Sequence, residues 1–438
     1  MHGSSAMLDV QQSQQRTPLW LDCDPGHDDA CALLLAIHHP SLELLGVSTV
    51  GGNAPGANTC ANAAQLLVAL GAPESVELWR GSDLPLLKPA RSGDVAIHGE
   101  GGLGGVVGLP PLSDPAVQRR FTGPRSSVCI LETSLIPPHE PAAVVIRLAE
   151  LIGARIREGK PKLHIVITGP CTNIALFCKM YPHLLAGVEQ IVLMGGSAGR
   201  AGNRGPLAEF NILCDPEAAT IVFDADIKVV MAGLNVTHSA IFTQHLHARL
   251  LNGPSSAPTS GPSPIRTLLS SILTFFSHTY ASEFGFLLGP PVHDSLAVMY
   301  LIDPKLFWTY EPAVTAIYGQ KHSNASSKSR MPTEQAVSEI VPNGDVDDGH
   351  TSGLARSVDG DRPLVPPQRY QVRVECSSGS LAEGATVVDW WNNWGLEHDG
   401  WGRGGKNVEV LEEVDLEKMW ATFMEVVDRA EGILHPDH

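Results

Sequence analysis

Short apolar runs alternate with amphipathic segments through most of the chain. The runs are rich in aliphatic residues, which is typical of strands buried in a parallel sheet, and the segments between them have helical spacing. The expected strands span residues 18–21, 42–50, 76–79, 163–167, 190–194, 227–231 and 370–374, and the expected helices span residues 30–37, 57–70, 141–157, 265–286 and 416–430. This alternation predicts an α/β fold with an open, mostly parallel, Rossmann-like sheet that is flanked by helices.

Polar segments interrupt the pattern in three places. Residues 1–16 are rich in Gln and Ser, and we expect a disordered tail there. Residues 252–264 and 320–367 are rich in Ser, Gly, Pro and Asp, and we expect flexible inserts because these segments are too polar to pack. Residues 17–438 are therefore predicted to form a single large domain with two insertions.

The acidic balance of the chain limits the classes of partner. Its 438 residues carry a formal net charge of −17, which argues against a nucleic acid or an anionic membrane as partner. No run approaches the ~18 apolar residues of a membrane span. The N-terminal segment has no secretory signal, and the spacing of the cysteines matches no zinc or redox motif. We therefore expect a cytoplasmic protein with reduced thiols.

Four carboxylates are crowded where the first expected strand gives way to a helix. Asp22 and Asp24 point to the same side of an extended strand, and Asp28 and Asp29 lie at the helix start, where free N–H groups favour negative charge. One such Asp is commonly a cap, but four like charges repel one another. A bound cation would offset this repulsion, and oxygen ligands favour a hard ion, Ca²⁺ or Mg²⁺. A paired-Asp strand end is also found in phosphoryl-transfer enzymes.

Other polar side chains also follow expected strands. Asn53 comes after the second strand, and Thr168 and Asn203 come after later ones. Ligands of open α/β sheets bind outside the carboxyl ends of the strands. We therefore expect these residues to share one site with Asp24.

Two further features have an ordinary structural interpretation. His98 lies in a Gly-rich segment, where we expect a mobile loop and where a solvated histidine is common. Phe275, Phe276, Tyr280 and Phe284 recur at helical spacing, which is typical of core packing.

Six blocks of the sequence match one family in the same order. The chain resembles the inosine–uridine-preferring nucleoside hydrolases, and within them the pyrimidine-preferring, uridine-cleaving branch. The blocks are Asp22-Cys23-Asp24-Pro25-Gly26-His27-Asp28-Asp29-Ala30, Gly51-Gly52-Asn53, Ile97-His98-Gly99, Thr168-Gly169-Pro170-Cys171-Thr172-Asn173, Ala208-Glu209-Phe210-Asn211 and Val292-His293-Asp294.

The resemblance implies a Ca²⁺ site. The ligands would be Asp24, Asp29 through both oxygens, the main-chain carbonyl of Thr168, and Asp294. Because Ca²⁺ accepts about six to eight oxygens, this set leaves room for a water molecule and for two hydroxyls of a ribose.

The resemblance also implies the reaction, which is hydrolysis of a ribonucleoside to free base and ribose. Asp24 would be the general base, and His293 and His98 are candidates to protonate the leaving base. Asp22 would position Asp24 or the following helix, and we expect no chemical role for His27. The family implies a homodimer or homotetramer. The remaining implied residues would bind the ribose hydroxyls: Asp28, Asn53, Asn203, Glu209 and Asn211.

Three other functions remain open at this point. The enzyme could prefer purine nucleosides, for which an aromatic clamp near the base is expected. A metal-dependent phosphohydrolase built on Asp22 and Asp24 would need a basic phosphate pocket, whereas the strand ends here carry acids and amides. A non-catalytic nucleoside-binding protein would not need a general base and an acid.

Overall fold

A computed structural model describes residues 16–91, 93, 95–121, 141–253, 261–310 and 364–436. The chain divides into two compact units, one made of Met1–Thr309 with Pro366–His438 and the other of Tyr310–Val365. In the second unit, the described residues are Tyr310 and the short strand β8 (Leu364–Val365). The expected tail, apart from Arg16, and most of both expected inserts lie outside the described residues, so these expectations stay predictions.

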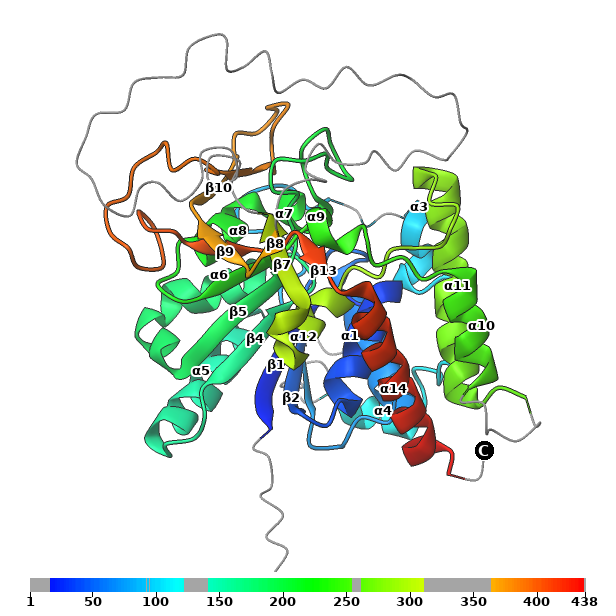
Figure 1. Ribbon diagram of the computed structural model, residues 1–438. Coiled ribbons are helices and arrows are strands. Elements are labelled where there is room, and N and C mark those ends of the chain that lie inside the picture. The colour runs from blue at the N-terminus through cyan, green and yellow to red at the C-terminus, as the bar shows by residue number, and fades with distance from the viewer. Residues whose placement is uncertain are drawn as a thin grey trace, which may run out of the picture. The chain divides into compact units, whose positions relative to one another are not determined.

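The first unit is built around an eight-stranded sheet with the order β3-β2-β1-β4-β5-β6-β12-β9 (Figure 1). Every neighbouring pair is parallel except the last, in which β9 runs antiparallel to β12. The expected mostly parallel α/β fold is therefore confirmed. The strands are β1 (Thr17–Cys23), β2 (Leu42–Thr49), β3 (Glu77–Arg80), β4 (Leu163–Ile167), β5 (Val188–Met194), β6 (Val229–Ala232), β9 (Gln368–Tyr370) and β12 (Val408–Val410).

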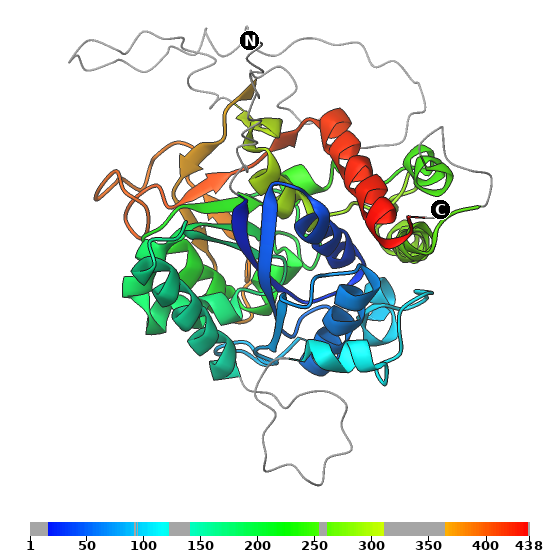
Figure 2. The ribbon, with the colours of Figure 1, turned by 90° about the horizontal axis from the view of Figure 1, so that it is seen from below.

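Helices cover both faces of this sheet (Figure 2). On one face the core includes apolar residues of α1, α2, α11, α12 and α14, and on the other it includes those of α5, α6 and α8. The long helices are α1 (His27–His38), α2 (Gly56–Ala69), α5 (Pro141–Arg157), α6 (Thr172–Met180), α8 (Pro216–Phe223), α10 (Gln244–Asn252), α11 (Pro264–Phe284), α12 (Ser295–Ile302) and α14 (Leu416–Leu434). The short ones are α3 (Val95–His98), α4 (Pro115–Arg120), α7 (Phe210–Cys214), α9 (Leu234–Thr237), η1 (Glu100–Gly102), η2 (Pro182–Gly187) and η3 (Pro304–Leu306).

The C-terminal strands differ from the expectation of one outer strand at residues 370–374. The chain passes from the main sheet to a second sheet at Gln371, so the segment forms β9 and then β10 (Val372–Val374). Strand β10 pairs antiparallel with β11 (Thr386–Val388). A further antiparallel pair joins β7 (Phe307–Tyr310) to β13 (Glu413–Val414).

Strand β1 lies in the middle of the sheet and is almost wholly buried. Its neighbours β2 and β4 place Ser48 and Ile167 beside Asp22. The indole Nε1 of Trp20 donates a hydrogen bond of 2.8 Å to Ser48 Oγ, so a polar atom in the core is satisfied. The carboxyl end of β1 is thus held by both neighbouring strands.

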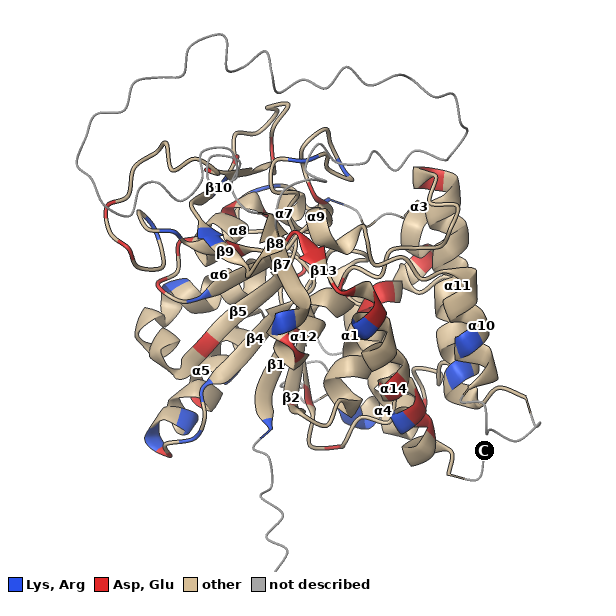
Figure 3. Ribbon diagram, in the orientation of Figure 1, with Lys and Arg blue, Asp and Glu red and all other residues tan. Residues whose placement is uncertain are grey.

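In the described part of the chain, no helix combines the length and the apolar character that a membrane crossing requires. Figure 3 shows Lys and Arg residues scattered over separate elements.

Candidate active site

The acids that follow the first strand lie close to an acid that is distant in sequence. Strand β1 ends at Cys23, and Asp28 and Asp29 occupy the first turn of α1. The N–H of Gly26 donates to Asp29 Oδ2 at 2.8 Å, which fixes the start of the helix. Carboxylate oxygens of Asp28, Asp29 and Asp294 all lie within 4.8 Å of one another, and all three residues are buried.

Asp24 lies next to this triad and has one orphaned oxygen. Its Oδ2 accepts a hydrogen bond of 2.7 Å from the N–H of Asn53, and the Asn53 side chain also reaches Asp29 Oδ2 at 3.4 Å. Its Oδ1 is buried and has no hydrogen-bond partner among the described residues. A Cβ at position 169 would lie 2.7 Å from this oxygen, so Gly169 is required for the close approach. A buried carboxylate oxygen without a hydrogen-bond partner is what we expect of a group that binds a cation.

Thr168 joins the acids to the opposite wall of the site. It follows β4, and its Oγ1 donates a hydrogen bond of 2.8 Å to Asp29 Oδ1. Its carbonyl oxygen accepts a hydrogen bond of 2.8 Å from Asn211 Nδ2. A carbonyl oxygen has a second lone pair, so this group is still able to bind a cation.

Burial raises the pKa of all four carboxyl groups. Burial, and then the charge of Asp29, raise the pKa of Asp24 well above its usual range and raise the pKa of Asp28 to about 8. Burial raises the pKa of Asp29 to about 6, and burial with the charge of Asp28 raises the pKa of Asp294. The cluster therefore holds protons unless another positive charge replaces them. Carboxylate and carbonyl oxygens are ligands that suit a hard divalent ion such as Ca²⁺.

The loop between β5 and α7 places three further predicted residues at the site. Asn203 Oδ1 accepts a hydrogen bond of 2.9 Å from the N–H of Phe210. Glu209 caps α7 by accepting from the N–H groups of Asn211 at 2.8 Å and Ile212 at 3.0 Å. Asn203, Glu209 and Asn211 line the same cavity as Asn53, Thr168 and two of the acids, Asp28 and Asp294.

His293 is held between two hydroxyl groups. Its Nε2 lies 2.9 Å from the Tyr280 hydroxyl, and its Nδ1 lies 2.8 Å from Thr237 Oγ1. Burial, and then the nearby His238, lower the pKa of His293 well below its usual range. The imidazole is therefore neutral at neutral pH, and its ring is fixed in orientation by two hydrogen bonds.

His98 is not the solvated loop histidine that its surroundings suggested. It ends the short helix α3 and is only 7% exposed. Its ring stacks on His27 at 5.6 Å and on Phe276 at 5.5 Å between centroids. Burial, with the neighbouring His27, lowers the pKa of His98 well below its usual range. The glycines around it allow tight packing rather than exposure, since a Cβ at Gly26 would collide with the ring.

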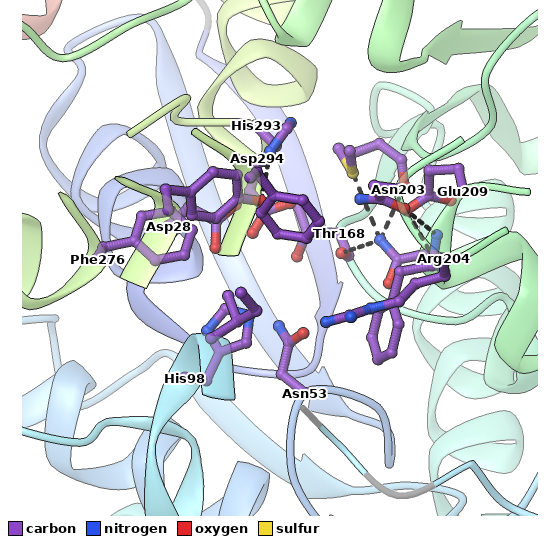
Figure 4. A pocket seen from close by; sticks show the side chains of 16 residues that line it. Asp28, Asn53, His98, Thr168, Asn203, Arg204, Glu209, Phe276, His293 and Asp294 are labelled. Atoms are coloured by element: carbon purple, nitrogen blue, oxygen red, sulfur yellow. Dashed lines mark hydrogen bonds between the residues drawn. The ribbon is translucent and has the colours of Figure 1, made fainter. Parts of the chain in front are cut away.

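The cavity has an acidic floor and an aromatic wall (Figure 4). The described residues that line it include every predicted site residue except Asp24 and Asp29, which lie at its base beside Asn53. The helical spacing of the aromatic stripe of α11 is typical of core packing, and Phe276, Tyr280 and Phe284 of this stripe also line the cavity. Sequence reasoning also missed Arg204, because a single Arg in a Gly-rich loop carries no periodic signal.

Asp22 and His27 lie behind these lining residues. Asp22 Oδ1 accepts hydrogen bonds from Ser48 Oγ and from Asn173 Nδ2, the latter at 2.8 Å. His27 Nε2 lies 3.0 Å from the Gly104 carbonyl, and the ring stacks on Phe275. Because a carbonyl only accepts, His27 carries its proton on Nε2 in that contact.

Comparison with known proteins agrees with this geometry. The pyrimidine-specific ribonucleoside hydrolase RihA of Salmonella paratyphi A is 36% identical over 294 residues, which cover 67% of this chain and 82% of that protein. The uridine nucleosidase of Saccharomyces cerevisiae is 35% identical over 318 residues, covering 71% and 82%. The solved structure of a purine-preferring ribonucleoside hydrolase from Gardnerella vaginalis matches with a TM-score of 0.64 and 23% identity, over 95% of this chain and 100% of the other.

The structural match shows the shared fold. A family model described as inosine-uridine preferring nucleoside hydrolase matches residues 19–421, which is nearly the whole chain. This match covers the acidic end of β1, the loop before α7 and the helix that follows Asp294. The chain therefore belongs to the inosine–uridine preferring nucleoside hydrolase family, whose members hydrolyse N-glycosidic bonds.

Proposed function

We propose that the protein is a Ca²⁺-dependent hydrolase of pyrimidine ribonucleosides, with uridine as the preferred substrate and cytidine as a second one. The observation that carries the proposal is the cluster of buried acids beneath a cavity with an aromatic wall. The names of the two sequence relatives, pyrimidine-specific ribonucleoside hydrolase and uridine nucleosidase, support the choice of base. A homo-oligomer and a cytoplasmic location remain predictions.

Four groups would hold the ion: the carboxylates of Asp24, Asp29 and Asp294 and the carbonyl oxygen of Thr168. When bound, Ca²⁺ would anchor the 2′ and 3′ hydroxyls of the ribose and lower the pKa of a neighbouring water molecule. The orphaned Oδ1 of Asp24 supports this set. Asp28 would then accept a hydrogen bond from a ribose hydroxyl.

The reaction exchanges one bond at the anomeric carbon for another. Water attacks C1′ as the C1′–N1 bond breaks, and the bonding electron pair leaves with the base. The Asp24 carboxylate takes a proton from the water, and the base gains one as it leaves, so the products are ribose and free base. Asn53 and the side chains of the β5–α7 loop would hold the ribose hydroxyls as charge develops on the ring.

The departing base would be protonated from the aromatic wall. The Tyr280 hydroxyl, 2.9 Å from Nε2 of His293, would give its proton to the base and regain one from His293. The proton that Asp24 takes from the water would return to His293 through solvent, so the site ends in its starting protonation state. His98 lies at the end of α3 across the cavity and is the second candidate (Figure 4). The imidazole rings of His98 and His293 are both held in place by packing, so neither ring has to be immobilised when the substrate binds.

Base preference and reaction type are tested together with four substrates. We expect the purified enzyme, assayed with Ca²⁺ and without phosphate, to release base and ribose from uridine fastest, then from cytidine, and more slowly from inosine. Deoxyuridine should be inert because it lacks the 2′ hydroxyl of the diol that the site binds. Chromatography of base and ribose gives the rates. A preference for inosine would contradict the pyrimidine assignment, and turnover that requires phosphate would indicate phosphorolysis.

Substitutions at Asp24 and His293 should separate the general base from the acid. Asp24→Asn should lower kcat by about 10²–10⁴-fold on uridine and equally on 4-nitrophenyl riboside, because attack of water is still required. His293→Ala should lower kcat on uridine but leave 4-nitrophenyl riboside nearly unaffected, because nitrophenolate leaves without a proton. Equal behaviour of the two variants on both substrates would contradict these roles.

Metal binding should remove the pH dependence of stability that the buried acids cause. Because folding raises the pKa of Asp28 to about 8 and that of Asp29 to about 6, the folded metal-free protein binds more protons than the unfolded chain. Its stability should therefore fall as pH rises through 6 to 8, whereas Ca²⁺ should remove this slope and raise Tm. Thermal melts with EDTA or with Ca²⁺ measure both effects. The Asp294→Asn variant should lose the Ca²⁺-induced rise, and an unchanged rise would contradict the ligand set.

A further inference from the structure

Arg204 contributes a permanent positive charge to a cavity that is otherwise acidic or neutral. Among the described residues that line the cavity, it is the one Lys or Arg, and it lies between Asn203 and Glu209 on the β5–α7 loop. Its side chain points into the cavity (Figure 4). A guanidinium has five N–H donors and stays charged at any physiological pH.

The guanidinium lies on the aromatic wall. Its Cζ is 5.6 Å from the Phe210 ring centroid and 5.8 Å from the Phe284 ring centroid. Phe284 packs on Tyr280, with centroids 5.1 Å apart, and Tyr280 reaches His293. This chain of contacts connects Arg204 to the wall from which the base would be protonated. The partial burial of the guanidinium strengthens its interaction with a nearby negative charge.

The other groups of this wall supply no positive charge. Among the described residues that line the cavity, the other groups with a full charge are the acids Asp28, Glu209 and Asp294. When the C1′–N1 bond of a pyrimidine nucleoside breaks, the electron pair left on N1 spreads over the ring oxygens. Uracil offers two such oxygens, O2 and O4, whereas cytosine has an amino group in place of O4. Arg204 is the one permanently positive group among the described lining residues that could stabilise this negative charge.

We propose that Arg204 is a catalytic and specificity-determining residue that binds the departing pyrimidine at its carbonyl oxygens and favours uracil over cytosine. This inference rests on the proposed pyrimidine hydrolase function. The guanidinium donates hydrogen bonds to the oxygens as the C1′–N1 pair moves onto the base, and it transfers no proton. An exocyclic amino group cannot accept from a guanidinium, so cytosine keeps acceptors at O2 and the ring nitrogen N3 and loses the contact at O4.

A phosphate on the 5′ carbon would be another anion for Arg204. The surroundings of Arg204 argue against a phosphate there, because the carboxylate of Glu209 lines the same cavity. A phosphate placed there would meet a carboxylate, whereas a neutral base that becomes negative only during bond cleavage is not repelled on binding. Uridine 5′-phosphate is therefore included in the test.

The test compares the Arg204→Gln variant with the wild-type enzyme on four substrates: uridine, cytidine, 4-nitrophenyl riboside and uridine 5′-phosphate. Arg204→Lys keeps the charge but not the planar fork of donors. The matched control is Arg249→Gln, which removes an exposed Arg on α10, outside the cavity lining. Thermal melts of each variant monitor folding.

Arg204→Gln should lower kcat for uridine by about 10²-fold, as expected for loss of one donor to a developing anion, with a smaller loss for cytidine. The loss should be smallest for 4-nitrophenyl riboside, whose leaving group already carries its charge well. Arg204→Lys should recover part of the activity, and Arg249→Gln should match the wild type on every substrate.

Three results would overturn the inference. The first is a loss of kcat in Arg204→Gln that is equal on uridine, cytidine and 4-nitrophenyl riboside, with or without a large fall in Tm. It would assign Arg204 a merely structural role. Efficient turnover of uridine 5′-phosphate that is lost in Arg204→Gln would assign it to phosphate binding. A wild-type enzyme that is inactive on both pyrimidine nucleosides would overturn the proposed function as well, whereas the first two results leave that function intact.

Discussion

Mutual repulsion among buried carboxylates is the constraint on which the rest of the structure depends. Asp28, Asp29 and Asp294 have oxygens within 4.8 Å of one another, and Asp24 adds its charge from the end of β1. Burial raises the pKa of all four carboxyl groups, and the charge of a neighbouring carboxylate raises those of Asp24, Asp28 and Asp294 further. A fold built for stability alone would not gather them, since hydrophobic residues of similar volume serve a core better.

The sheet provides the means of holding these groups together. Parallel strands deliver their carboxyl ends to one edge, so β1 and β4 bring Asp24 and Thr168 to the same place although they are distant in sequence. The helix α1 begins immediately after β1 and offers N–H groups to Asp29. The segment before α12 contributes Asp294, which is distant in sequence from β1. Glycines at 52 and 169 let the backbone approach Asp24 closely.

The side of the cavity lined by aromatic rings is apolar, unlike the side lined by acids and amides. Rings from α11, which come from a stripe that also packs in a small core with Ile97, close one side of the cavity. They exclude water from the base, whereas the acids and amides opposite them suit a polyol. This division of the cavity into a polar half and an aromatic half matches the two parts of a nucleoside.

Asp24, Asp28 and Asp29 could be predicted from the sequence because they stand where a strand recognisable by its apolar run gives way to a helix. Asp294 precedes α12, and its role came from the family resemblance alone. Helical spacing alone did not assign Phe276 and Tyr280 to the cavity, because this spacing is the same for a core stripe and for a stripe that also lines a cavity. Strand β12 escaped prediction because it is three residues long and its partner β6 is distant in sequence. His98 was misjudged because glycines are typical of both mobile loops and tight packing, and only tertiary contacts distinguish the two.

The position of one Ca²⁺ ion, determined by anomalous diffraction from crystals grown with Ca²⁺, tests the central claim most directly. The account predicts a single ion with oxygens of Asp24, Asp29 and Asp294 and the Thr168 carbonyl at about 2.3–2.6 Å. An empty site at millimolar Ca²⁺, or an ion that binds without Asp24, would contradict it.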